Sequence, residues 1–135
     1  MNQLGGKIKD IDTHESISLV KVISEENILF SSVVIDTPET CKYLQIGSNV
    51  SILFKETEVS ISKEEVQKIS IQNRIPCTIK SILGGAIFTK IELQCGTHEI
   101  TSIITTNSSK DLKLSINDNV IALIKTNEIS LSYHD

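Results

Sequence analysis

The fold is decided by residues 120–132, VIALIKTNEISLS, which repeat residues 50–62, VSILFKETEVSIS. Six of the thirteen aligned pairs are identical, and most of the others keep apolar character. The offset of 70 continues upstream and becomes 71 near the start of each repeat, as at Leu44/Leu114, Ile46/Ile116, Ser32/Ser102, Ile8/Ile79 and Ile11/Ile82. One residue was therefore gained or lost in a hairpin. The sequence predicts two tandem copies of one module, residues 1–62 and 70–135, joined by a linker at 63–69.

Within each copy, short β-rich runs alternate with polar or glycine-containing turns, which is typical of a sandwich or small barrel. For the second copy we expect strands at 74–83, 86–94, 97–106, 119–125 and 128–133, with turns at Gly84-Gly85, Cys95-Gly96 and Asn117-Asp118. Five strands with a helix after the third is the plan of the OB-type barrel. The fold class we predict is all-β, with two tandem OB-like five-stranded barrels that each carry a short helix after the third strand.

Capping residues support that short helix. Thr37 and Asn107 align in the polar segment after the third strand, and both residue types favour the N-cap position. Pro38 fits the first helical position of the first copy. In the linker, the Ser62-x-x-Glu65 pattern predicts one capped helical turn.

Composition excludes several classes of protein. The chain has 13 Lys and Arg residues against 17 Asp and Glu, which argues against a nucleic-acid partner because such a partner is bound mainly through basic residues. Apolar runs such as residues 120–124 fall far short of the ~20 residues that cross a bilayer, and the N-terminus lacks a signal-peptide pattern. We therefore expect a cytoplasmic protein without a membrane partner. The odd number of cysteines, Cys41, Cys77 and Cys95, predicts reduced thiols in or near the core.

Three segments of the second copy carry a family resemblance. They are residues 70–75, SIQNRI, residues 104–114, ITTNSSKDLKL, and residues 120–126, VIALIKT. In spacing and residue type they resemble the molybdate-binding Mop module, found in molbindins and in the transport-associated OB domains of molybdate transporters and regulators. Through the internal repeat the resemblance extends over nearly the whole chain, which looks like a di-Mop molbindin.

The resemblance implies an oxyanion site and no catalysis. A tetrahedral dianion needs converging hydroxyl and N–H donors and at least one cation. The positions that match the family's ligand site are Ser70, Gln72, Asn73, Thr105, Ser108, Lys125 and Thr126. Lys125 would bring the charge, and Asn107 would cap a helical turn that begins at Ser108. The resemblance implies molybdate or tungstate as ligand, no cofactor, and a homo-oligomer, most simply a trimer of two-module chains.

Departures from the family pattern keep an alternative open. Gln72 stands where the family has arginine, so the site has one cation fewer, which lowers the expected affinity or changes the ligand. The first copy has Ile35, Pro38 and Glu56 where the second has Thr105, Ser108 and Thr126, which leaves Lys55 as a possible weak second site. The alternative is a ligand-free Mop-fold module for oligomerisation or interaction.

Other chemistry has little support in the sequence. The Cys95-x-x-His98 spacing offers only two local ligands, so we expect no metal site there. No Ser-His-Asp or Cys-His pattern can be assigned, and no glycine-rich phosphate loop precedes a helix, so we expect no enzyme.

Overall fold

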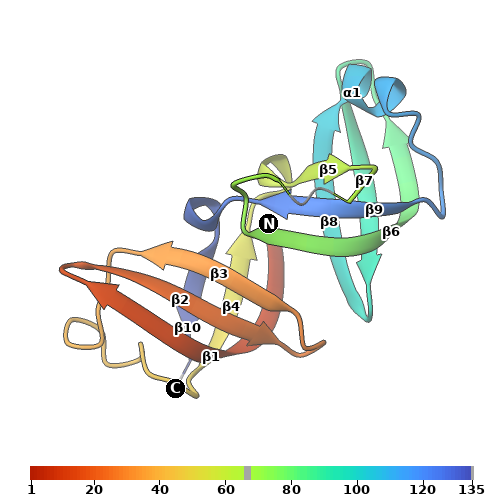
Figure 1. Cartoon of the computed structure of the whole chain (residues 1–135). Coiled ribbons are helices and arrows are strands. Elements are labelled where there is room, and N and C mark those ends of the chain that lie inside the picture. Colours follow the sequence, from red (N-terminus) through yellow and green to blue (C-terminus); the bar gives the residue numbers. More distant parts are fainter. Residues whose placement is uncertain (66–67, 135) are drawn as a thin grey trace. The chain divides into compact units, whose positions relative to one another are not determined.

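The computed structural model describes residues 1–65 and 68–134. In this part of the chain, ten strands form two five-stranded antiparallel sheets (Figure 1). The first sheet, in the order β10-β4-β1-β2-β3, contains β1 (Asn2–His14), β2 (Ile17–Ser24), β3 (Leu29–Val34), β4 (Asn49–Phe54) and β10 (Ser130–Tyr133). The second, in the order β5-β9-β6-β7-β8, contains β5 (Ser60–Ser62), β6 (Asn73–Gly84), β7 (Phe88–Cys95), β8 (His98–Thr105) and β9 (Asn119–Ile124). The predicted all-β class with two OB-like five-stranded modules is confirmed.

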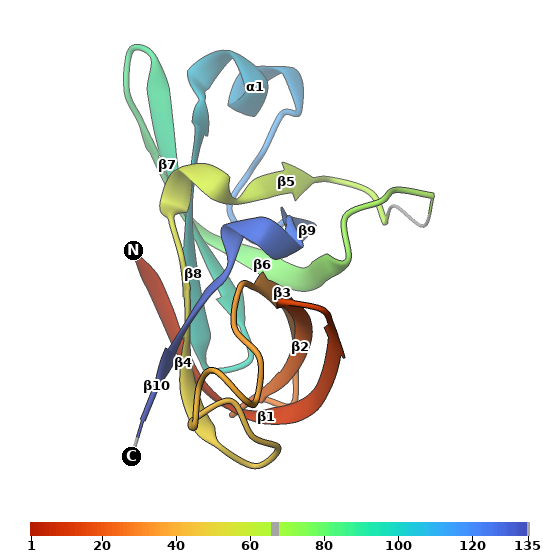
Figure 2. The same ribbon diagram turned by 90° about the vertical axis from the view of Figure 1, so that its left-hand side faces the viewer.

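The fifth strand of each copy lies in the sheet of the other copy. β10 pairs with β4, and β5 pairs with β9, as the views in Figures 1 and 2 both show. The compact units are therefore a first unit, residues 1–54 with 125–135, and a second unit, residues 55–124. These units differ from the sequence division at 1–62, 63–69 and 70–135, because each copy supplies four strands to one unit and one strand to the other.

Two buried serines make the same contact in both units. The Ser32 hydroxyl donates to the Ile129 carbonyl at 2.6 Å, and the Ser102 hydroxyl donates to the Val59 carbonyl at 2.7 Å. Both serines are almost fully buried, so each hydroxyl needs a partner inside the fold. Each bond joins the third strand of one copy to the segment that leads into the fifth strand of the other. The strand exchange therefore gives the buried serine hydroxyl of each unit an equivalent carbonyl acceptor.

Alternating burial builds each core. Along β7, Thr89, Ile91, Leu93 and Cys95 are buried while the residues between them are more exposed, as the two-residue period of a strand requires. In the first unit the rings of Phe30 and Phe54 lie 6.2 Å apart between centroids, and each side chain is 1% exposed. The apolar runs that suggested strands are thus the inward faces of the two sheets.

The turns and the length difference lie where the repeat predicts them. Gly96 and Asn117 occupy predicted turns with φ of +61° and +74°, a region that glycine and asparagine enter most easily. The register of β1 shifts between Ile8 and Asp10, and that of β6 shifts between Ile79 and Ser81, so both copies carry an irregularity at the same place. The extra residue of the first copy lies in the β2–β3 hairpin: four residues separate Ser24 from Leu29, against three between the equivalent residues Cys95 and Glu99.

The short helix is formed only in the second copy, as α1 (Thr106–Asp111). In the first copy, Thr40 N and Cys41 N donate to the Thr37 carbonyl at 3.1 and 2.9 Å, but this turn does not continue as a helix. The Thr40 hydroxyl accepts from Thr37 N at 2.8 Å and the Thr37 hydroxyl accepts from Thr40 N at 3.2 Å, so the expected cap at Thr37 forms although the helix does not continue beyond it. The expected helix of the first copy is thus replaced by a single turn.

A helical turn was also expected in the linker after Ser62. Ser62 donates its hydroxyl to the Glu64 carbonyl at 2.5 Å, and residues 63–65 do not form the helical turn expected after Ser62; residues 66 and 67 lie outside the described residues. No helix among the described residues is long and apolar enough to span a membrane.

None of the three cysteines forms a disulfide, and Cys77 and Cys95 are buried while Cys41 is half-buried, as predicted.

Candidate functional site

Thr105 and Ser108 are brought together at the end of β8. Thr105, not Asn107, is the N-cap of α1, because its hydroxyl accepts from Ser108 N at 3.1 Å. The same hydroxyl donates to Ser108 Oγ at 2.9 Å. Ser108 can therefore donate its own hydroxyl hydrogen to a ligand, and both side chains are exposed. The expected cap at Asn107 was wrong by two residues, because β8 runs directly into the helix.

Asn73 plays a different part from its exposed neighbours. It is 1% exposed and donates Nδ2 to the Ile124 carbonyl at 3.0 Å, across the paired ends of β6 and β9. This bond fixes the last residue of β9, and the next residue in the chain is Lys125. Ser70 and Gln72 lie in the segment that leads into β6, and both are exposed. Asn73 thus holds the end of β9 in place, while Ser70 and Gln72 are open to solvent.

Lys125 and Lys55 have matching local geometry. Each directly follows a strand and precedes a short 3-10 helix, η2 (Thr126–Glu128) after Lys125 and η1 (Glu56–Glu58) after Lys55. Their backbone angles agree, with φ −67° and ψ 148° for Lys125 and φ −75° and ψ 147° for Lys55. Both side chains are exposed. The copies differ in the following residue, which is Thr126 or Glu56, so only Lys125 has a hydroxyl beside it.

The strand exchange divides the predicted site residues between the units. The second unit contains Ser70, Gln72, Asn73, Thr105, Ser108 and Lys55, whereas the first unit contains Lys125 and Thr126. The structure therefore joins Thr105 to Ser108 by hydrogen bonds, and Asn73 to the strand that precedes Lys125. The seven residues are not gathered within one compact unit.

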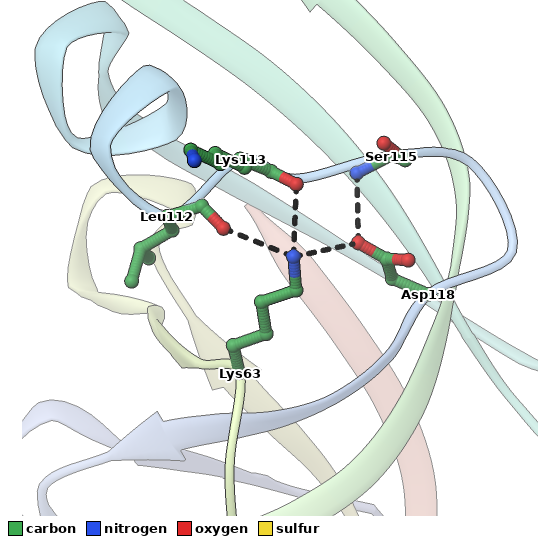
Figure 3. A network of polar contacts seen from close by, with 5 residues as sticks. All are labelled: Lys63, Leu112, Lys113, Ser115 and Asp118. Atoms are coloured by element: carbon green, nitrogen blue, oxygen red, sulfur yellow. Dashed lines mark hydrogen bonds and ion pairs between the residues drawn. The ribbon is translucent and has the colours of Figure 1, made fainter.

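Lys63 is a residue that the sequence reasoning missed. Its ammonium group donates to the carbonyls of Leu112 and Lys113 at 3.1 and 2.9 Å and lies 3.6 Å from the Asp118 carboxylate (Figure 3). Asp118 in turn accepts from Ser115 N at 2.9 Å. Carbonyls at a helix end lack partners within the helix, so this contact stabilises the end of α1. Lys63 thereby helps to hold the helix that contains Ser108, and its separation of 49 residues from Leu112 hid this contact in the sequence.

Comparison with known proteins gives a match to one domain family over part of the chain and a similar fold over nearly all of it. Residues 69–131 match the TOBE domain family. The whole fold is similar to that of the cytoplasmic molybdate-binding protein ModG, whose structure has molybdate bound, with a TM-score of 0.91 and 22% identity over 97% of this chain and 94% of that chain. A molybdate-binding protein from Sporomusa ovata is 37% identical over 44% of this chain and 88% of that chain, with a TM-score of 0.43. A sequence search among curated proteins gives no match.

Proposed function

Because residues 69–131 are a TOBE domain and the whole chain has the molbindin-like fold of two Mop modules, we propose that this protein binds molybdate or tungstate without catalysing a reaction. The observation that carries the proposal is the extent of the TOBE match, which contains every site residue expected in the second copy, from Ser70 to Thr126. By the same likeness we propose a cytoplasmic protein that acts in molybdenum storage, homeostasis or sensing.

The proposed site combines hydroxyls with one cation. The hydroxyls of Ser70, Thr105, Ser108 and Thr126 supply neutral donors to the oxyanion, and Gln72 adds an amide donor. Lys125 supplies the charge, which strengthens its hydrogen bond relative to a neutral one. Asn73 contributes through the buried bond that fixes the end of β9. In the first copy Lys55 stands beside Glu56, whose carboxylate repels a dianion, so Lys55 forms at most a weak second site.

Calorimetric titration of the protein with molybdate, tungstate and sulfate tests this function. We expect saturable heats with molybdate or tungstate. Sulfate has the same charge and shape but is smaller, so its affinity reports on the size of the site. The absence of saturable binding of any of the three ions would contradict the proposal.

The alternative function, a ligand-free oligomerisation or interaction module, is favoured by one observation. Large apolar side chains are exposed at equivalent positions of both copies: Ile17 and Phe88 are 51% and 57% exposed, and Ile46 and Ile116 are 69% and 57% exposed. Exposed apolar surface that recurs in this way is typical of protein interfaces. Oligomerisation and oxyanion binding are compatible. The calorimetric titration decides whether the protein binds an oxyanion.

The same apolar positions support our proposal that the protein is a homo-oligomer, most simply a trimer. We expect sedimentation velocity at micromolar concentration to give a mass of three chains. Phe88→Glu places a charge on one of these positions and should shift the distribution toward monomer. Lys90→Glu, at an exposed position two residues further along β7, is the matched control and should not. A wild-type protein that sediments as a monomer would rule the oligomer out.

Replacing Gln72 by arginine, the residue of the resembled family at this position, should strengthen oxyanion binding. Gln72→Arg adds a planar fork of donors that suits oxyanions, at an exposed position just before β6. We expect molybdate affinity to rise, with a gain that shrinks at high salt because exposed charges are screened. Gln45→Arg adds the same charge at an exposed position of the first unit and serves as control. An equal gain from both substitutions would show a general charge effect in place of a site.

A further inference from the structure

Cys77 and Cys95 face each other across adjacent strands of the second unit. In the β6–β7 ladder, Thr78 pairs with Gln94, and the next step along both strands brings Cys77 opposite Cys95. The equivalent residues of the first unit, Gly6 and Ser24, do pair in register. Residues directly opposite each other project from the same face of a sheet. Both cysteines point inward, with exposed fractions of only 5% and 8%.

The two thiol side chains are in contact, and the surroundings of Cys77 hold the proton on its sulfur. Cys77 donates Sγ–H to the Ile75 carbonyl at 3.3 Å. Burial, followed by the neighbouring Cys95 and the hydrogen bond between the two side chains, raises the pKa of Cys77 to about 12. At neutral pH Cys77 therefore keeps its proton. Because thiolate is the nucleophile in disulfide exchange, this environment slows oxidation of the pair to a disulfide.

A cavity gives access to this pair. It has a volume of about 460 Å³ and is lined by both cysteines and by Lys63, Glu65, Gln94 and Asn119, among others. The wall is thus partly polar, and the side chains of Gln94 and Asn119 are only partly covered or exposed. Both cysteines thus lie at the edge of a solvent-filled space as well as in the core.

We propose that Cys77 and Cys95 form a two-coordinate site for a soft monovalent metal ion, of the class of Cu⁺ and Ag⁺. Soft ions of this class prefer thiolate ligands and accept two of them, whereas Zn²⁺ in proteins takes four ligands and Mg²⁺ and Ca²⁺ take oxygen. No cluster of three or more His, Cys, Asp or Glu residues suited to a metal occurs within residues 1–65 and 68–134. A two-sulfur donor set therefore selects the soft monovalent class.

The binding step balances without redox chemistry. The metal ion forms one bond to each sulfur, and both thiol protons leave to solvent, so the charge of the cluster becomes −1. Binding therefore tightens as pH rises, since fewer protons must be displaced. The site belongs to the second unit alone, because the first unit has Gly6 and Ser24 at the equivalent positions.

The test uses Ag⁺ as probe and Cys41→Ser as the starting protein, so that Cys77 and Cys95 are the only thiols. Titration followed by calorimetry and native mass spectrometry should give one Ag⁺ per chain. Cys95→Ser and Cys77→Ser in this background should each weaken Ag⁺ binding at least about a hundredfold, because a single sulfur remains. Cys95→Ser installs the residue that the first copy already carries at Ser24. Two equivalents bound independently, or undiminished affinity in Cys95→Ser, would overturn the proposal.

A second measurement keeps the proposal testable if a serine variant does not fold. When Cys41→Ser is unfolded in denaturant, both thiols of the metal-free protein should react with N-ethylmaleimide, whereas one equivalent of Ag⁺ bound beforehand should protect both to the same extent, as judged by mass spectrometry. Protection of only one thiol, or of neither, would overturn the two-sulfur site. A loss of two mass units without added metal would show a disulfide and would also overturn it.

Discussion

Ile129→Ala is expected to destabilise the first unit by about 2–5 kcal/mol, the usual cost of truncating a buried isoleucine. Ile129 is 2% exposed, and its carbonyl accepts the buried hydroxyl of Ser32. Although Ile129 belongs to the second sequence copy, the strand exchange places it in the first unit. Hydrogen exchange should therefore quicken in residues 2–54, where local opening becomes easier.

Val59→Ala is the matched control. Val59 is the equivalent residue of the first copy, is 1% exposed, and accepts the hydroxyl of Ser102 through its carbonyl. Its truncation should quicken exchange in residues 73–124 instead. If Ile129→Ala were to quicken exchange only in residues 73–124, the fifth strands would lie with their own copies and the exchange would be wrong.

Much of this fold could be predicted, because the patterns that encode it are local. Alternation of apolar and polar residues defined the strands, and β6, β7 and β8 begin and end within about two residues of the expected bounds. Glycine and asparagine marked the turns because they enter positive φ at little cost. The repeat also predicted that the length difference lies in a hairpin, and in the structure this is the β2–β3 hairpin.

The strand exchange could not be predicted, because both fifth strands carry nearly the same sequence. Residues 58–62, EVSIS, and 128–132, EISLS, fit either sheet equally well in residue type and length. The partners that hold them, Ser32 and Ser102, are also equivalent. Local sequence therefore determines that a strand forms here but does not determine which sheet it joins.

For the candidate site, the sequence predicted which types of residue would be present, but it did not predict the contacts that they make. Threonine before a helix is a good cap, yet the choice between Thr105 and Asn107 depended on where β8 ends. The role of Asn73 required knowing its burial and its bond to Ile124. Lys63 acts across a long sequence separation, which no local pattern reveals.

Lys125→Ala is expected to weaken molybdate binding roughly ten- to a hundredfold, because a hydrogen bond to a charged group contributes about 1.5–3 kcal/mol. Lys55→Ala is the control, since Lys55 has the same backbone geometry but stands beside Glu56. It should change the affinity less. Calorimetric titration of both variants measures the difference, and equal losses would contradict a site built on the second copy.

The central claim, that this chain binds a tetrahedral oxyanion, is tested most directly by molybdenum content after equilibrium dialysis. Wild-type protein is dialysed against increasing molybdate, and molybdenum is measured on both sides of the membrane. We predict an excess on the protein side that saturates at a fixed ratio to protein and falls when tungstate is added. Equal molybdenum concentrations on both sides at every molybdate concentration would contradict the claim.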